Sequence, residues 1–105
     1  MLKTYNSALA GKRALVTGAA RRIGAAVALK LADDGADVAI TYEKSSEHAN
    51  AIVAEIRAMG RKAVAIQADA ALAESATAAV EQAVEELGGL DILVNNAGVL
   101  FTGDF

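Results

Sequence analysis

The residues most suited to chemistry begin with a glycine-containing loop near the start of the chain. Residues 17–24 read Thr-Gly-Ala-Ala-Arg-Arg-Ile-Gly. Gly18 allows a tight turn, and Gly24 allows a following helix to pack close to a sheet. The N–H groups at the start of such a helix, with the positive end of its dipole, suit a pyrophosphate. Glycines beside a helix start are also common in ordinary α/β turns, so this loop alone does not decide between the two interpretations. No Lys-Ser or Lys-Thr follows Gly24, which excludes a P-loop.

A second group of polar residues follows the next apolar run. At this position an NAD-binding fold usually presents Asp or Glu to the adenosine ribose, whereas this sequence has Tyr42. Lys44 and Ser45 offer a cation and a hydroxyl to a 2′-phosphate, and Arg21 can approach from the first loop. These residues favour NADP(H) over NAD(H). Two alternatives stay open: a shift of one residue would make Glu43 the ribose-binding acid, or Lys44 and Ser45 form a solvated turn with a helix N-cap.

The elements that must position these loops are short apolar runs alternating with helical stripes. We expect strands at residues 14–17, 37–42, 63–66 and 92–94. The intervening helices are predicted to end at Gly35, Gly60 and Gly88, where a left-handed residue lets the chain turn back. Their apolar stripes are Ile23, Val27 and Leu31; Ala49, Ile52, Val53, Ile56 and Met59; and Ala76, Ala79, Val80, Ala83, Val84 and Leu87.

This alternation predicts an α/β fold with a parallel sheet between two helix layers, because the apolar strands require burial on both faces. Right-handed crossovers make the strand order 3-2-1-4 the expected one, so residues 1–105 are predicted to form one dinucleotide-binding domain of Rossmann type. Ligands bind such sheets beyond the carboxyl ends of the strands. The corresponding loops are residues 18–22, 42–46, 69–70 and 95–98.

The fourth of these loops decides between the interpretations of the first. Residues 91–98 read Asp-Ile-Leu-Val-Asn-Asn-Ala-Gly. With the first loop, this segment resembles the short-chain dehydrogenase/reductase family, whose members carry Thr-Gly-x-x-x-Gly-x-Gly after the first strand and Asn-Asn-Ala-Gly after the fourth. The resemblance extends from about Gly11 to Val99. It implies that Asp69 contacts adenine and that the segment starting at Asn95 lies along the adenosine ribose.

One residue departs from the family pattern. Arg22 stands where the family most often has its middle glycine, which puts the usual loop geometry in doubt. Relatives that resemble pteridine reductases also carry a basic residue there, so we expect Arg22 to reach the cofactor phosphates. The alternative is a solvated charge at the start of a helix. The complete set of expected cofactor-binding residues is Gly18, Ala20, Arg21, Arg22, Ile23, Gly24, Tyr42, Lys44, Ser45, Asp69, Ala70, Asn95, Ala97 and Gly98.

The hydride-transfer machinery of the family is not identifiable in this sequence. The resemblance implies a Tyr-x-x-x-Lys motif with a Ser and an Asn, but Tyr5 and Tyr42 are followed four positions later by Leu9 and Ser46. Family members are about twice as long or longer. We therefore expect the chain to be the N-terminal portion of a longer enzyme, a fragment that binds the dinucleotide without turnover. The resemblance implies that the parent is an NADPH-dependent carbonyl reductase, most like the 3-oxoacyl-acyl carrier protein reductases.

Two other functions are compatible with parts of this pattern. An S-adenosylmethionine-dependent methyltransferase also uses a glycine loop and a carboxylate after the third strand, but it gives no reason for Asn-Asn-Ala-Gly and would require an acid in place of Tyr42. A non-catalytic dinucleotide-binding or interaction module would retain the fold and make no demand on a catalytic set.

Composition narrows the remaining possibilities. The 105 residues are 54% hydrophobic with a net charge of −3, and no basic stripe suggests a nucleic-acid partner. No Cys and only one His are present, so neither a disulfide nor a zinc site of usual composition is expected. We find no secretory signal and no apolar run long enough to span a membrane. We expect a cytoplasmic protein with a small-molecule substrate, whose parent forms a homo-oligomer.

Overall fold

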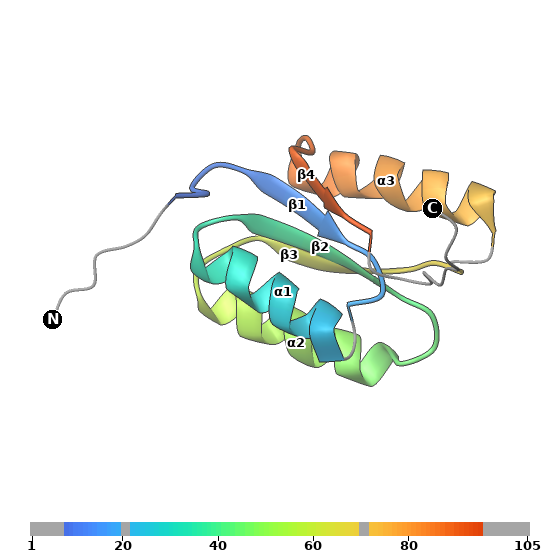
Figure 1. Cartoon of the computed structure of the whole chain (residues 1–105), viewed down its shortest axis with the longest axis horizontal. Coiled ribbons are helices and arrows are strands. Elements are labelled where there is room, and N and C mark those ends of the chain that lie inside the picture. Colours follow the sequence, from blue (N-terminus) through green and yellow to red (C-terminus); the bar gives the residue numbers. More distant parts are fainter. Residues whose placement is uncertain (1–7, 20–21, 70–71, 96–105) are drawn as a thin grey trace, which may run out of the picture.

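Strands and helices alternate along the whole described part of the chain. A computed structural model describes residues 8–19, 22–69 and 72–95. Figure 1 shows the elements in chain order, which are β1 (Arg13–Val16), α1 (Arg22–Asp33), β2 (Asp37–Tyr42), α2 (Ser46–Ala58), β3 (Ala63–Gln67), α3 (Ala73–Leu87) and β4 (Ile92–Val94). The predicted strands and helices are confirmed with small shifts at their ends.

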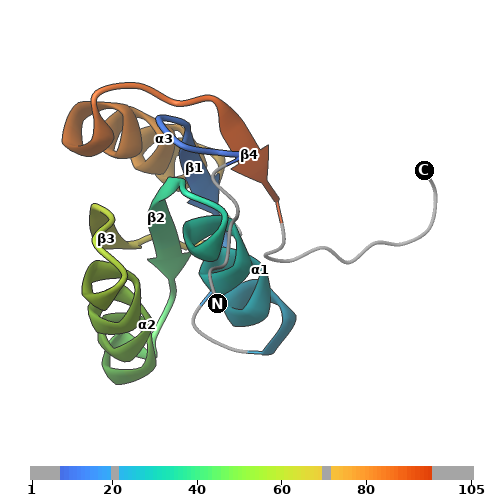
Figure 2. The ribbon, with the colours of Figure 1, turned by 90° about the vertical axis from the view of Figure 1, so that its left-hand side faces the viewer.

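The strands form a parallel sheet in the order β3-β2-β1-β4. Val16 of β1 lies opposite Ile40 of β2 and opposite Val94 of β4, so the carboxyl ends of these strands reach the same edge. Figure 2 shows α1 and α2 on one side of the sheet and α3 on the other. The predicted strand order and the Rossmann-type three-layer fold are therefore confirmed.

Both faces of the sheet are buried, as the uninterrupted apolar strands predicted. One face, with Val16, Val38 and Ile40, packs beneath α1 and α2. The opposite face, with Leu15 and Ala39 among its buried residues, packs beneath α3. The central strands β1 and β2 hence stand between two apolar layers, and their ends are fixed relative to each other.

The predicted core stripe of α1 is wrong by one position. The residues that face the sheet are Gly24, Ala28 and Ala32, whereas the Ile23 side chain is 71% exposed. Small residues allow the helix to approach the sheet closely, and this proximity outweighs the greater hydrophobicity of the stripe that begins at Ile23. Val27 and Leu31 of that stripe are only partly buried.

The stripes of the other two helices are better predicted. Ala49, Val53 and Ile56 of α2 are buried as expected. In α3 the buried residues are Ala79, Ala83 and Leu87, while the outer members of the expected stripe, Ala76 and Val84, are exposed. The predicted stripe of α3 was therefore too broad.

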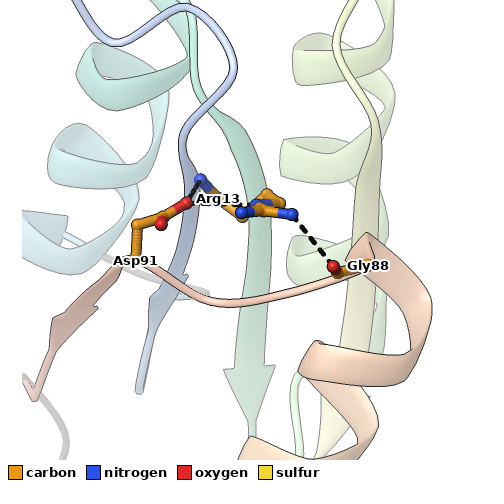
Figure 3. A network of polar contacts seen from close by, with 3 residues as sticks. All are labelled: Arg13, Gly88 and Asp91. Atoms are coloured by element: carbon orange, nitrogen blue, oxygen red, sulfur yellow. Dashed lines mark hydrogen bonds and ion pairs between the residues drawn. The ribbon is translucent and has the colours of Figure 1, made fainter.

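A polar network fixes the amino ends of β1 and β4, at the edge opposite the four loops. The Arg13 backbone N–H and its side-chain Nε both donate to one carboxylate oxygen of Asp91, at 2.9 Å and 3.1 Å. The Arg13 guanidinium also donates to the Gly88 carbonyl oxygen at 2.9 Å, and the three residues lie together in Figure 3. The hydrogen bonds from the Arg13 side chain and backbone lower the pKa of Asp91. The end of α3 and the start of β4 are thus held against β1, which sets the register of β4.

Candidate functional site

The parallel register brings the loops after β1, β2, β3 and β4 to one edge of the sheet. Nine of the predicted site residues lie in the described part of the chain: Gly18, Arg22, Ile23, Gly24, Tyr42, Lys44, Ser45, Asp69 and Asn95. Ala20, Arg21, Ala70, Ala97 and Gly98 lie outside the described residues. The site can therefore be built from the first group.

The turn after β1 is anchored by the end of β2. Gly18 has φ of +64°, a left-handed conformation that glycine adopts without strain. Its N–H donates to the Thr41 side-chain Oγ1 at 2.9 Å, and the next N–H, that of Ala19, donates to the Thr41 carbonyl oxygen at 3.0 Å. Sequence reasoning missed Thr41, although a polar residue within the apolar run Val-Ala-Ile-Thr was the available signal.

Helix α1 begins at Arg22 in the position that the family most often gives to glycine. Arg22 has φ of +48°, and within the described ranges no other non-glycine residue has a positive φ. Its side chain is exposed, and Gly24 is buried against the sheet. The chain thus keeps a glycine-like backbone here in spite of the arginine, at a cost of about 1–2 kcal/mol for a left-handed L-residue.

The first loop is also tied to the fourth. The Thr17 backbone N–H donates to the Val94 carbonyl oxygen at 3.0 Å. The Thr17 hydroxyl lies 3.1 Å from the Asn95 side-chain oxygen and donates to it. Asn95 thereby stands beside the start of the glycine-containing loop.

A shallow hollow opens between the second and third loops. Its lining residues are Glu43, Lys44, Gln67, Ala68, Asp69 and Ser75. The side chains of Glu43 and Lys44 are both exposed, so an acid and a base stand together at its rim. The predicted Lys44 and Asp69 are therefore brought to one depression of the surface.

Two hydrogen bonds shape this hollow, and neither could be predicted from the sequence. The Gln67 side-chain Nε2 donates to the Glu43 carbonyl oxygen at 3.1 Å, which ties the second loop to the end of β3. The Asp69 N–H donates to the Ser75 Oγ at 2.8 Å, which ties the third loop to the first turn of α3. Such contacts depend on which loops meet in space.

Tyr42 and Ser45 complete the second loop. Tyr42 is partly buried and packs against the apolar core on the α1 and α2 side. Ser45 occupies the N-cap position of α2, but its side chain makes no capping hydrogen bond. The interpretation of Ser45 as an N-cap is thus confirmed for its position and not for its hydroxyl.

The donor set fits an adenine dinucleotide. A lysine ammonium beside a serine hydroxyl suits a phosphate, and the hollow that Lys44 lines also has two carboxylates, those of Glu43 and Asp69, with Gln67 and the small residues Ala68 and Ser75. The described residues contain no group of three His, Cys, Asp or Glu side chains that could hold a metal ion. Within the same ranges, every helix is too short or too polar to cross a membrane.

Comparison with known proteins points in the same direction. Residues 12–105 match the protein family described as short chain dehydrogenase. The chain is 50% identical over 88 residues to a 3-oxoacyl-[acyl-carrier-protein] reductase of Staphylococcus aureus, covering 84% of this chain and 36% of that protein.

Two solved structures are also similar to this chain in sequence and in fold. A short chain dehydrogenase from Burkholderia cenocepacia in complex with NADP superposes with a TM-score of 0.85 and 63% identity, over 90% of this chain and 39% of that one. A blue fluorescent protein from a metagenomic library, in complex with NADPH, gives a TM-score of 0.84 and 52% identity, over 90% of this chain and 39% of that one. The chain therefore spans less than half the length of each of these proteins.

Proposed function

Because the chain belongs to the short chain dehydrogenase family, we propose that it is the NADP(H)-binding part of an oxidoreductase whose whole chain reduces a carbonyl group. A 3-oxoacyl thioester or a similar small molecule is the proposed substrate, by analogy with the reductase of Staphylococcus aureus. The observation that carries the cofactor assignment is Lys44 at the rim of the hollow, two positions after a strand that ends in Tyr42 instead of an acid.

Each loop has a proposed part in holding the dinucleotide. Gly18, Ala20, Ile23 and Gly24 form the turn and helix start that face the pyrophosphate, with Arg21 and Arg22 near the phosphates. Lys44 and Ser45 hold the 2′-phosphate, Asp69 and Ala70 contact adenine, and Asn95, Ala97 and Gly98 lie along the ribose. When bound, NADPH supplies the hydride. The proton donor and the nicotinamide pocket are proposed to come from the remainder of the whole protein.

The choice between NADP(H) and NAD(H) depends on two neighbouring side chains. Lys44 attracts a 2′-phosphate and Glu43 repels it, and both are exposed at the rim of the same hollow. Gln67 fixes the Glu43 carbonyl oxygen, so the backbone of this loop is held while the two side chains extend from it. A hydrogen bond to a charged group contributes about 1.5–3 kcal/mol. Lys44 is therefore proposed to outweigh the more diffuse repulsion by Glu43.

Titration of a Lys44→Ala variant with both cofactors tests this proposal. The variant of the full-length protein should bind NADPH at least about tenfold more weakly and NADH with little change. Lys62→Ala is the matched control, because Lys62 is also exposed but precedes β3 at the opposite edge of the sheet. Equal losses for both cofactors would show that Lys44 does not recognise the 2′-phosphate. A preference of the unaltered protein for NADH would identify Glu43 as the operative residue.

Family membership also bears on the two rival functions. It favours the dehydrogenase interpretation over a methyltransferase, since the match extends over residues 12–105 and includes the segment after β4. For the 105 residues alone, we propose dinucleotide binding without turnover. Hydride transfer by a preparation of verified mass would contradict that part of the proposal.

A further inference from the structure

Thr41 is an unusual residue in the core of this fold. Among the described residues it is the only buried polar residue, with 4% of its surface exposed. It lies in β2 one position before Tyr42, between the buried Ile40 and the second loop. A hydroxyl in such a place needs a hydrogen-bond partner to compensate for the water it has lost.

Its partners belong to the turn after β1. The Thr41 Oγ1 accepts from the Gly18 N–H at 2.9 Å, and the Thr41 carbonyl oxygen accepts from the Ala19 N–H at 3.0 Å. One residue therefore holds two consecutive N–H groups of the turn, and two anchor points fix its orientation as well as its position. The side-chain bond is the one that depends on the identity of residue 41.

The same strand end also holds the third loop. The Tyr42 carbonyl oxygen accepts from the Ala68 N–H at 2.9 Å. Residues 41 and 42 thus connect the turn after β1 with the hollow that Ala68 lines. The two parts of the candidate site, one for the pyrophosphate and one for the adenosine, share this strand end as their common support.

We propose that Thr41 is a positioning residue for cofactor binding, whose hydroxyl holds the turn at Gly18 in the shape that receives the pyrophosphate. This inference rests on the proposed function and adds to it a residue that does not touch the cofactor. Without the hydroxyl, the Gly18 N–H would lose the hydrogen bond to residue 41, and the turn would lose one of its two anchor points on the end of β2. Binding would then have to restore the original shape.

A purely structural role for Thr41 predicts the opposite order of variants. If the side chain only fills space, Thr41→Val should be tolerated, because valine has nearly the same shape, and Thr41→Ser should be harmful, because it removes a methyl group. If the hydroxyl positions the turn, Thr41→Ser should bind cofactor normally and Thr41→Val should not. The two variants therefore separate the two roles.

The test measures the Kd of NADPH and of NADH for the full-length protein and both variants, with thermal unfolding in the absence of cofactor as a check on folding. Thr41→Val should weaken both cofactors by a similar factor of about five to ten, since the pyrophosphate is common to them. Thr41→Ser should stay within about twofold of the unaltered protein. This pattern differs from that of Lys44→Ala, which should affect NADPH alone.

Several outcomes would overturn the inference. Normal binding by Thr41→Val, or equal losses in the Val and Ser variants, would show that the hydroxyl does not position the turn. If Thr41→Val fails to fold, Thr41→Ala and Thr41→Ser replace it as a pair that differs only by the hydroxyl, and equal affinities in that pair would be equally decisive. Absence of NADPH and NADH binding by the unaltered protein would instead overturn the proposed function.

Discussion

Replacement of Arg22 by glycine should stabilise the protein although it removes a large side chain. Arg22 has φ of +48°, and its exposed side chain makes no hydrogen bond or ion pair among the described residues. The left-handed conformation costs an L-residue about 1–2 kcal/mol, which glycine would avoid. Glycine also has more freedom in the unfolded chain, and this opposes folding by about 0.4–1 kcal/mol. The expected net gain in the free energy of unfolding is about 0.8 kcal/mol.

Thermal unfolding of the full-length protein without cofactor measures this gain. For a protein of about 250 residues, the expected rise in Tm is about 2–3 °C. Arg22→Ala is the control, because alanine removes the same guanidinium but keeps the Cβ that makes a left-handed backbone costly. The difference between the glycine and alanine variants then reports the backbone alone.

An Arg22→Gly variant that melts at or below the temperature of Arg22→Ala would show that the backbone at this position carries no strain. The same two variants also test the expected contact with the phosphates. Both should bind NADPH about tenfold more weakly if the guanidinium reaches a phosphate. Unchanged affinity in both would favour a solvated charge at the start of α1.

Three further predictions concern the scaffold. Because Arg13 lowers the pKa of Asp91 from 3.8, ionised Asp91 stabilises the fold above that pH and ceases to do so as the pH falls through the lowered value. The difference in the free energy of unfolding between the unaltered protein and Asp91→Asn, measured in urea, should therefore vanish in acid. A difference that does not depend on pH would contradict this prediction. Ala28→Leu should destabilise the fold by about 1–3 kcal/mol in urea unfolding, because a larger side chain does not fit between α1 and the sheet. Ala26 is exposed, so Ala26→Leu should change the free energy of unfolding by less than about 0.5 kcal/mol. Equal effects of the two substitutions would show that α1 does not pack closely. Among the described strands β4 pairs only with β1, and Leu93 is 55% exposed, so β4 forms an open edge of the sheet. Such an edge favours pairing with another chain, and the isolated 105-residue chain should therefore associate as its concentration rises in sedimentation experiments. A stable monomer would show that this edge is closed.

The elements and their order could be predicted from the sequence because each is specified locally. Each apolar strand is followed by a helix, and glycines such as Gly35, with φ of +114°, mark the helix ends. Right-handed crossovers then leave few topologies. The same logic placed Lys44 and Asp69 at one edge of the sheet, since parallel strands end together.

Features that depend on close approach in space could not be predicted in this way. Gly24 is buried, as its predicted close packing against the sheet requires, but hydrophobicity alone favoured the stripe of Ile23 for the core face of α1. That the face with Gly24 and Ala28 is buried in its place did not follow from the pattern. Thr41 stands out as a polar residue in an apolar run, but its contact could not be predicted, because its partner, Gly18, lies 23 positions away in the sequence. The left-handed backbone of Arg22 could not be predicted either, since an arginine at this position favours an ordinary helical conformation.

Calorimetric titration of the unaltered full-length protein with NADPH, NADH and S-adenosylmethionine tests the central claim most directly. We predict saturable binding of NADPH that is at least about tenfold tighter than that of NADH, with no binding of S-adenosylmethionine. The claim would be contradicted if NADH bound as tightly as NADPH or if neither dinucleotide bound.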